Sequence, residues 1–130
     1  MADEGEEKMK FREIILKSGA RLLLGKDAES NEKLVKKFEG KPDIILHTKA
    51  PGSPFCVIEV KNPGKADKKE AAIYCARYSQ DWRDNKKDVK VNVFTGKDVY
   101  KQKDMPTGTF GVKKSKTIVV KKKDILKLLK

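Results

Sequence analysis

An α+β fold, with a mainly antiparallel sheet and two main helices in a single domain, is predicted by the order of apolar patterns along the chain. Short apolar runs rich in β-branched residues, typical of strands, alternate with two longer segments that carry apolar residues at helical spacing. The resulting order is two strands, a helix, two strands, a helix and further strands, which is that of an α+β domain. With 130 residues, the chain is long enough to bury one modest core.

The ordered part of the chain begins with a predicted hairpin and helix. Residues 11–26 form two apolar runs around the turn pair Ser18-Gly19, a pattern that predicts a β-hairpin. A helix is predicted over residues 27–40, because capping residues precede an apolar face and a glycine follows it. These positions are Asp27 or Ser30 at the start, Leu34, Val35 and Phe38 on the face, and Gly40 at the end.

Asn31 falls on the apolar face of this helix. Burying an amide costs free energy unless the amide is hydrogen-bonded. We therefore expect Asn31 to have a fixed partner and to tie the helix to a loop.

Two strands are predicted next, over residues 43–49 and 55–60. The loop between them holds Pro51 and Pro54 on either side of Gly52. Both proline rings fix φ, so the sequence predicts a stiff loop.

A second helix is predicted over residues 67–82, where Asp67 and Glu70 resemble a capping box. Small side chains recur along one face, which suits close packing on a sheet, and Trp82 is expected to fill a core edge. The small residues are Ala72, Cys75, Ala76 and Ser79.

The rest of the chain predicts strands. In residues 88–96, valines alternate with polar residues and place one apolar face on the core. The last segment, residues 124–130, fits a short strand or an amphipathic helix. Shorter strands are predicted within residues 97–103, 107–114 and 117–123.

The composition is that of an ordered, soluble domain, with 38% hydrophobic and 38% charged residues. No apolar run is long enough to span a membrane, and no signal peptide is visible, so a cytoplasmic protein is expected. Residues 1–10 are polar and are predicted to be a flexible tail, which leaves residues 11–130 as the domain. Cys56 and Cys75 lie in apolar runs and are interpreted as buried thiols of a reducing compartment. With one histidine and no thiolate cluster, we expect no metal site and no cofactor.

The net charge of +12 is unevenly distributed. Residues 1–60 carry 11 basic and 11 acidic side chains, whereas residues 61–130 carry 20 basic and 8 acidic ones. Such asymmetry favours a polyanionic partner. A generally lysine-rich composition is the alternative, because 27 of the 31 basic residues are lysine.

One pattern points to catalysis. Pro42-Asp43, followed by Glu59 and Lys61, has the spacing of a Mg²⁺-dependent nuclease of the PD-(D/E)xK type. The pattern is short and loose in a chain so rich in charge. The predicted topology also leaves no room for one of the strands that this nuclease core needs. On the alternative interpretation, Glu59 and Lys61 form a surface pair.

A longer set of ordered motifs resembles the NFACT-R domain, the RNA-binding module of the NFACT ribosome quality-control proteins called NEMF in animals and RqcH in bacteria. The resemblance covers about residues 11–120. The matching positions are Gly25, Asp27, Ala28 and Asn31; His47, Pro51, Gly52 and Ser53; Ala71, Ala72, Cys75, Ala76 and Ser79; and Pro106 with Gly108.

The chain departs from the family pattern in the loop, where the family has a second histidine and this chain has Pro54. It also has Ile45 where the family places an aromatic residue. Any contact made by that second histidine is therefore not expected here.

The resemblance implies a non-catalytic RNA-binding module that works in translation, ribosome quality control or RNA metabolism. The implied partners are tRNA or ribosomal RNA and the ribosome, with DNA as a further polyanion that phosphate contacts do not distinguish. The chain resembles a stand-alone member of the family, so elongation of stalled chains is not implied. The alternatives are the nuclease and a basic protein-interaction module.

The expected RNA-binding residues combine the loop after the first histidine with basic side chains of the second half. Lysines on either side of Tyr100 supply charge next to a ring that can stack on a base, and loop N–H groups can bind phosphate. Asn31, Pro51 and Ser79 are expected to shape the site. The predicted contacts are His47, Lys49, Gly52, Ser53, Arg77, Lys97, Tyr100, Lys101, Lys103, Lys113, Lys114 and Lys116.

Overall fold

A computed structural model of the chain describes residues 11–130. The predicted tail, residues 1–10, lies outside the described residues. Within the described part, no helix is both long enough and apolar enough to cross a membrane.

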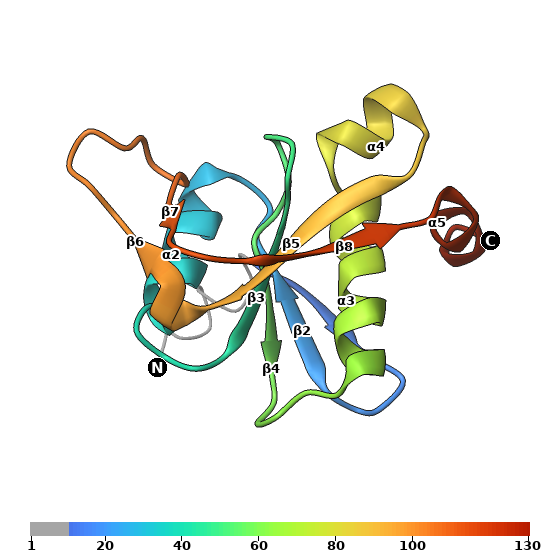
Figure 1. Cartoon of the computed structure of the whole chain (residues 1–130), viewed down its shortest axis with the longest axis horizontal. Helices are drawn as coiled ribbons and strands as arrows, with labels where there is room; N and C mark the ends of the chain where they lie inside the picture. The colour runs from blue at the N-terminus through green and yellow to red at the C-terminus, as the bar shows by residue number, and fades with distance from the viewer. Residues whose placement is uncertain (1–10) are drawn as a thin grey trace.

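The centre of the molecule is a six-stranded sheet in which every neighbouring pair is antiparallel, as predicted (Figure 1). The order across the sheet is β1-β2-β4-β3-β5-β8. Its strands are β1 (Arg12–Ile15), β2 (Arg21–Leu24), β3 (Ile44–Thr48), β4 (Cys56–Glu59), β5 (Val89–Thr95) and β8 (Lys116–Val120).

A two-stranded ribbon, β6 (Val99–Tyr100) with β7 (Gly111–Val112), follows β5 after the short 3-10 turn Gly96–Asp98. The two predicted strand segments here are therefore much shorter than expected. The long connection between β6 and β7 folds back towards the first helix instead of extending the sheet (Figure 1).

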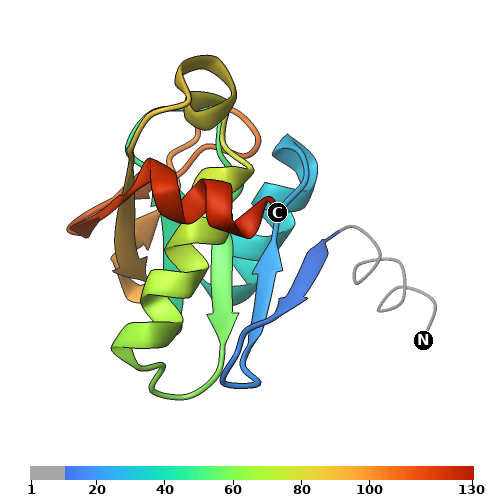
Figure 2. The same cartoon turned by 90° about the vertical axis from the view of Figure 1, so that its right-hand side faces the viewer.

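Helices cover both faces of the sheet. The long helix α3 (Lys65–Arg77) packs with α5 (Lys122–Leu128) on one face, as Figure 2 shows, while α2 (Ala28–Phe38) lies on the other. A short helix, α4 (Gln80–Asn85), follows α3 directly.

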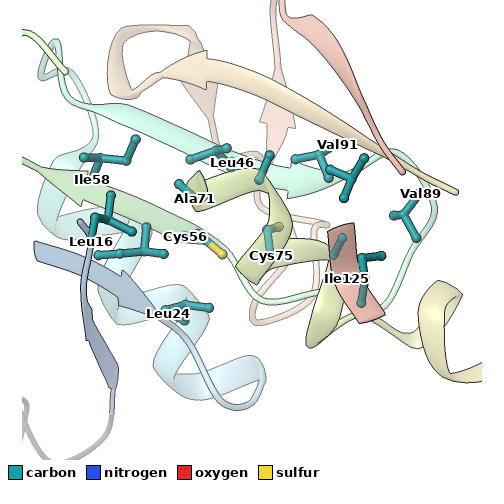
Figure 3. Close-up of a cluster of buried hydrophobic side chains, with 14 of the residues drawn as sticks. Leu16, Leu24, Leu46, Cys56, Ile58, Ala71, Cys75, Val89, Val91 and Ile125 are labelled. Atoms are coloured by element: carbon teal, nitrogen blue, oxygen red, sulfur yellow. The ribbon is translucent and has the colours of Figure 1, made fainter. Parts of the chain in front are cut away.

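Two apolar clusters result, one on each face. The larger one joins the sheet to α3 and α5 and includes Leu46, Cys75 and Ile125 (Figure 3). The smaller one joins the sheet to α2 and includes Leu34 and Phe55. Burial of strands on both faces explains why the central strands read as continuous apolar runs in the sequence.

The second predicted helix is divided in two. Ser79 has an extended backbone, and its hydroxyl accepts a hydrogen bond from the Trp82 N–H at 3.2 Å while donating one to the Ala76 carbonyl at 2.6 Å. Serine in this role caps a new helix, α4, rather than continuing α3. The expectation of a single helix over residues 67–82 was wrong because it treated Ser79 only as a small residue. Trp82 is buried as predicted.

The chain ends in a helix, the second of the two forms considered for residues 124–130. This helix, α5, begins at Lys122, so the predicted strand over residues 117–123 is too long and ends at Val120.

Candidate nucleic-acid interface

A cleft of about 860 Å³ lies where the β3–β4 loop meets the start of α2, the start of α4 and the β6–β7 connection. In Figure 1 these segments gather at the same end of the sheet, away from the β4–α3 turn. The cleft is lined by basic, aromatic and small polar side chains. The lining includes Arg12, Gly25, Lys26, Asp27, Asn31, His47, Lys49, Pro51, Gly52, Ser53, Phe55, Tyr78, Gln80, Arg83, Gly108 and Phe110.

The β3–β4 loop is held in one shape by its own hydrogen bonds. The Thr48 N–H donates to Ser53 Oγ at 3.0 Å, and the Thr48 hydroxyl donates to the Ala50 carbonyl at 2.6 Å. Gly52 has a left-handed backbone with φ of 86°, and its carbonyl accepts from the Gln80 N–H at 2.7 Å. A Cβ at Gly52 would lie 2.8 Å from the Gln80 Cβ, so only glycine fits this contact. The loop is therefore docked on the start of α4.

His47 forms part of the cleft wall. Its ring packs on Phe55 with the centroids 4.4 Å apart, and Nδ1 lies 2.7 Å from the Thr48 carbonyl. Because a carbonyl only accepts, Nδ1 carries the proton and Nε2 is left as an acceptor. Burial lowers the pKa of His47 below its usual value, although the Thr48 hydrogen bond opposes part of that shift.

We expect His47 to titrate below pH 6.5 in the folded chain. Folding then favours the neutral ring, so its contribution to stability is complete above the unfolded pKa of 6.5 and is lost as pH falls below it. NMR titration of this single histidine gives its pKa directly. The stability of His47→Asn, which retains a donor near Nδ1, should vary less between pH 7 and pH 5. A ring that titrates at or above pH 6.5 would contradict the assignment.

Asn31 has the fixed partner that its burial requires. Its Oδ1 accepts a hydrogen bond from the Phe55 N–H at 3.0 Å, while the Gly25 N–H donates to the Phe55 carbonyl at 3.0 Å. These bonds tie α2 to the start of β4. They also set the orientation of the amide, whose nitrogen has no hydrogen-bond partner among residues 11–130.

Lys101 is committed to the protein itself. Its Nζ donates to Glu32 Oε1 at 3.0 Å and to the carbonyls of Pro106 and Thr109, both at 2.7 Å. Glu32 Oε1 also accepts from the Gly108 N–H at 2.7 Å. Burial alone would raise the pKa of Glu32, but the bonds from Gly108 and Lys101 outweigh it and lower the pKa. All three ammonium protons therefore have acceptors within the protein.

Two more predicted contact residues pack against their neighbours, although Tyr100 remains 37% exposed. The ring of Tyr100 lies directly over Gly111, where a Cβ would be 2.1 Å from the ring. Arg77 is half-buried, and its guanidinium lies 4.2 Å from the centre of the Tyr78 ring. Neither side chain lines the cleft.

The remaining predicted residues lie in the cleft, beside it or outside it. Asn31, His47, Lys49, Pro51, Gly52 and Ser53 line the cleft. Ser79 is buried beside it as the cap of α4. The other predicted lysines, Lys97, Lys103, Lys113, Lys114 and Lys116, are exposed and lie outside the cleft.

The cleft also contains residues that sequence reasoning missed. The guanidinium of Arg12, from β1, lies 4.0 Å from the centre of the Tyr78 ring, and Arg83 donates to the Tyr78 carbonyl at 3.3 Å and to Gln80 Oε1 at 2.8 Å. The charged lining comprises four basic side chains, Arg12, Lys26, Lys49 and Arg83, against one carboxylate, Asp27. The Pro-x-Gly turn was a usable signal for this wall, but no local pattern pointed to Arg12 or Arg83.

The nuclease pattern takes a different form in the structure. Glu59 Oε1 accepts two hydrogen bonds from the Arg21 guanidinium, one of them from Nε at 2.6 Å. The partner of Glu59 is therefore Arg21 instead of the expected Lys61. In residues 11–130, no three His, Cys, Asp or Glu side chains gather to hold a metal ion.

Comparison with known proteins gives one family and one fold. The model of the NFACT protein RNA binding domain matches residues 10–114. The archaeal Rqc2 homolog aRqcH of Methanocaldococcus jannaschii is 34% identical over 76 residues, or 57% of this chain and 11% of that protein. The C-terminal structure of the fibronectin/fibrinogen-binding protein of Streptococcus suis has a TM-score of 0.78 at 24% identity, covering 86% of this chain and 45% of that one. The chain thus spans about a tenth of the archaeal relative's length.

Proposed function

The chain belongs to the family of NFACT protein RNA binding domains, and we propose that it is a non-catalytic module that holds structured RNA at the cleft described above. The proposal rests on one observation, which is that sequence motifs far apart in the chain meet at one place in the fold. The motifs around Asn31, His47, Ser79 and Gly108 are far apart in the sequence, yet all of them line or border one basic cleft.

Different residues would contribute positive charge and hydrogen-bond donors to RNA binding. Lys49 and Arg83 supply charge at the edge of the cleft, and Gly52 and Ser53 offer backbone N–H groups that make no hydrogen bond within residues 11–130. The exposed lysines from Lys97 to Lys116 extend the attraction along the RNA backbone. Such contacts give affinity with little sequence preference.

We further propose that the RNA is tRNA or ribosomal RNA and that the chain acts in the cytoplasm near ribosomes. The support is the family itself together with the relation to aRqcH. The chain shares only a small part of that relative, so this partner assignment is tested separately, by crosslinking in cells and sequencing of the bound nucleic acid.

Binding should weaken steeply with salt. If six or more phosphates are engaged, affinity for an RNA hairpin should fall by orders of magnitude between about 50 and about 200 mM salt. Lys49→Gln should reduce the slope of log affinity against log salt by about one. Filter binding or fluorescence anisotropy measures both.

Lys61→Gln is the matched control, because it removes the same charge at the far end of β4 from the cleft (Figure 1). It should leave the slope unchanged. A salt response that is flat, or equally reduced in both variants, would contradict binding at the cleft.

A further inference from the structure

We propose that the cleft receives one unstacked nucleobase of the bound RNA, so that RNA with a bulged or looped nucleotide binds more tightly than a continuous duplex. This inference rests on the proposed function and makes it more specific. Phosphate binding needs only charge, whereas the cleft is built from aromatic rings and directed polar atoms as well.

The size and walls of the cleft suit a planar aromatic ligand. Its volume of about 860 Å³ lies within the range of small-molecule sites. Phe55 packs against His47, and its ring meets Phe110 edge to face at 5.7 Å. Phe110 and His47 are half-buried, so part of each ring faces the cleft. Bases released from a helix stack on such rings.

A second stacking surface lies at the rim. The guanidinium of Arg12 lies over the Tyr78 ring. The guanidinium of Arg77 also lies near this ring, 4.2 Å from its centre. Guanidinium planes accept stacked bases as aromatic rings do. Arg12 is therefore held in position before RNA arrives.

Two polar atoms that line the cleft can form hydrogen bonds with the edge of a base. The Asn31 amide nitrogen is a donor, because its Oδ1 is committed to the Phe55 N–H. His47 Nε2 is an acceptor, because Nδ1 donates to the Thr48 carbonyl. Base edges carry both donors and acceptors, so this pair complements a base and not a phosphate, which offers only acceptors.

The charges lie where the backbone of a flipped nucleotide would run. Lys49 and Arg83 are exposed, and the Arg83 guanidinium is fixed by the Tyr78 carbonyl and the Gln80 side chain. With the base inside, the flanking phosphates would stay at the rim beside these cations. A continuous A-form duplex keeps its bases stacked and could use only the rim.

The test compares three RNA hairpins with the full chain. One has a continuous stem, one carries a single-nucleotide bulge, and the third has the same bulge with the base removed. The phosphate content of the last two is identical. We expect the bulged hairpin to bind about tenfold or more tightly than the abasic one, in line with the stacking of one base on aromatic side chains. The abasic and continuous hairpins should bind alike.

Two protein variants place the effect in the cleft. His47→Asn retains the donor to Thr48 and removes the ring, and Asn31→Asp retains the acceptor for the Phe55 N–H and removes the amide donor. Both should shrink the ratio of bulged to abasic affinity. The added charge of Asn31→Asp weakens all three RNAs together, so the ratio is the readout. Lys61→Gln should leave the ratio unchanged.

The outcomes separate the two proposals. Equal, salt-sensitive binding of all three hairpins overturns base insertion and leaves RNA binding at the cleft intact. A ratio that survives both cleft variants overturns the location of the base. No binding of any hairpin overturns the proposed function, and base insertion with it. A 2-aminopurine base in the bulge, quenched on binding, reports stacking without any protein variant.

Discussion

Replacing Lys101 with methionine is expected to lower the free energy of unfolding by about 3 kcal/mol, because it breaks a mostly buried ion pair and leaves its acceptors unpaired. The side chains of Lys101 and Glu32 are only 19% and 17% exposed. Three hydrogen bonds of the ammonium would be lost, two of which hold the turn from Pro106 to Thr109. The ammonium also lies 4.7 Å from the centre of the Phe110 ring, and that cation–π contact is lost as well. Methionine keeps most of the apolar stem, so the change removes mainly the charged group.

Lys103→Met is the matched control. It lies in the same basic segment but is exposed, so its effect on stability should stay within about 0.5 kcal/mol. Urea unfolding compares the two variants. Hydrogen exchange at the Gly108 amide should speed up in Lys101→Met alone, because the turn loses its anchor. If both variants are equally stable, the ammonium is not committed to the fold.

Lowering the pH should cause part of the stability loss that is expected for Lys101→Met. The pKa of Glu32 is lowered in the folded chain, so the bridge contributes fully above the ordinary value of 4.5 and is lost as pH falls below that value. The stability difference between the wild-type chain and Lys101→Met should therefore shrink below pH 4.5.

The pair Lys101 and Lys103 also shows what local sequence does not encode. Both lysines lie in one basic segment beside Tyr100, and sequence reasoning treated them alike. Their roles differ because Glu32, far away in the chain, lies under one and not under the other. The same holds for Arg12, which is far from Tyr78 in the sequence and meets it only in the folded chain.

Periodicity, by contrast, predicted the parts of the fold that depend on neighbours in sequence. The apolar face of α2 is buried as its spacing indicated, and Asp27 caps the helix. The small side chains of α3 lie against the sheet, where close approach leaves no room for larger ones. These features follow from helix geometry alone, without knowledge of the tertiary contacts.

The candidate site could be predicted from the sequence only in part. The order of the motifs, including Asn31 and the loop around Gly52, identified the family, and nine of the matching positions line the cleft. Their meeting at one place could not be derived from spacing, because it depends on which strands pair. Ser79 illustrates the limit within a single residue. Its size fitted a helix stripe, but its hydroxyl ends that helix and begins the next.

Gly25→Ala is expected to have the second large effect, about 2–4 kcal/mol of lost stability, since it combines overpacking with a buried N–H left unpaired. A Cβ at this position would lie 1.9 Å from Asn31 Oδ1 and 3.1 Å from the Asn31 Cα. The amide must therefore move and release the Phe55 N–H. Gly64→Ser is the control, because nothing lies within 4 Å of a Cβ there and serine is a good cap.

A double-mutant cycle decides whether the clash acts through Asn31. In an Asn31→Ala background the obstructing oxygen is gone, so adding Gly25→Ala should cost much less than it does alone, with a coupling energy of about 1–3 kcal/mol. Additive effects would mean that the glycine serves backbone geometry and not the contact with the amide. Coupling would mean that one small residue keeps the Asn31 donor aimed at the cleft. RNA affinity should then fall in Gly25→Ala even under conditions where the chain is fully folded.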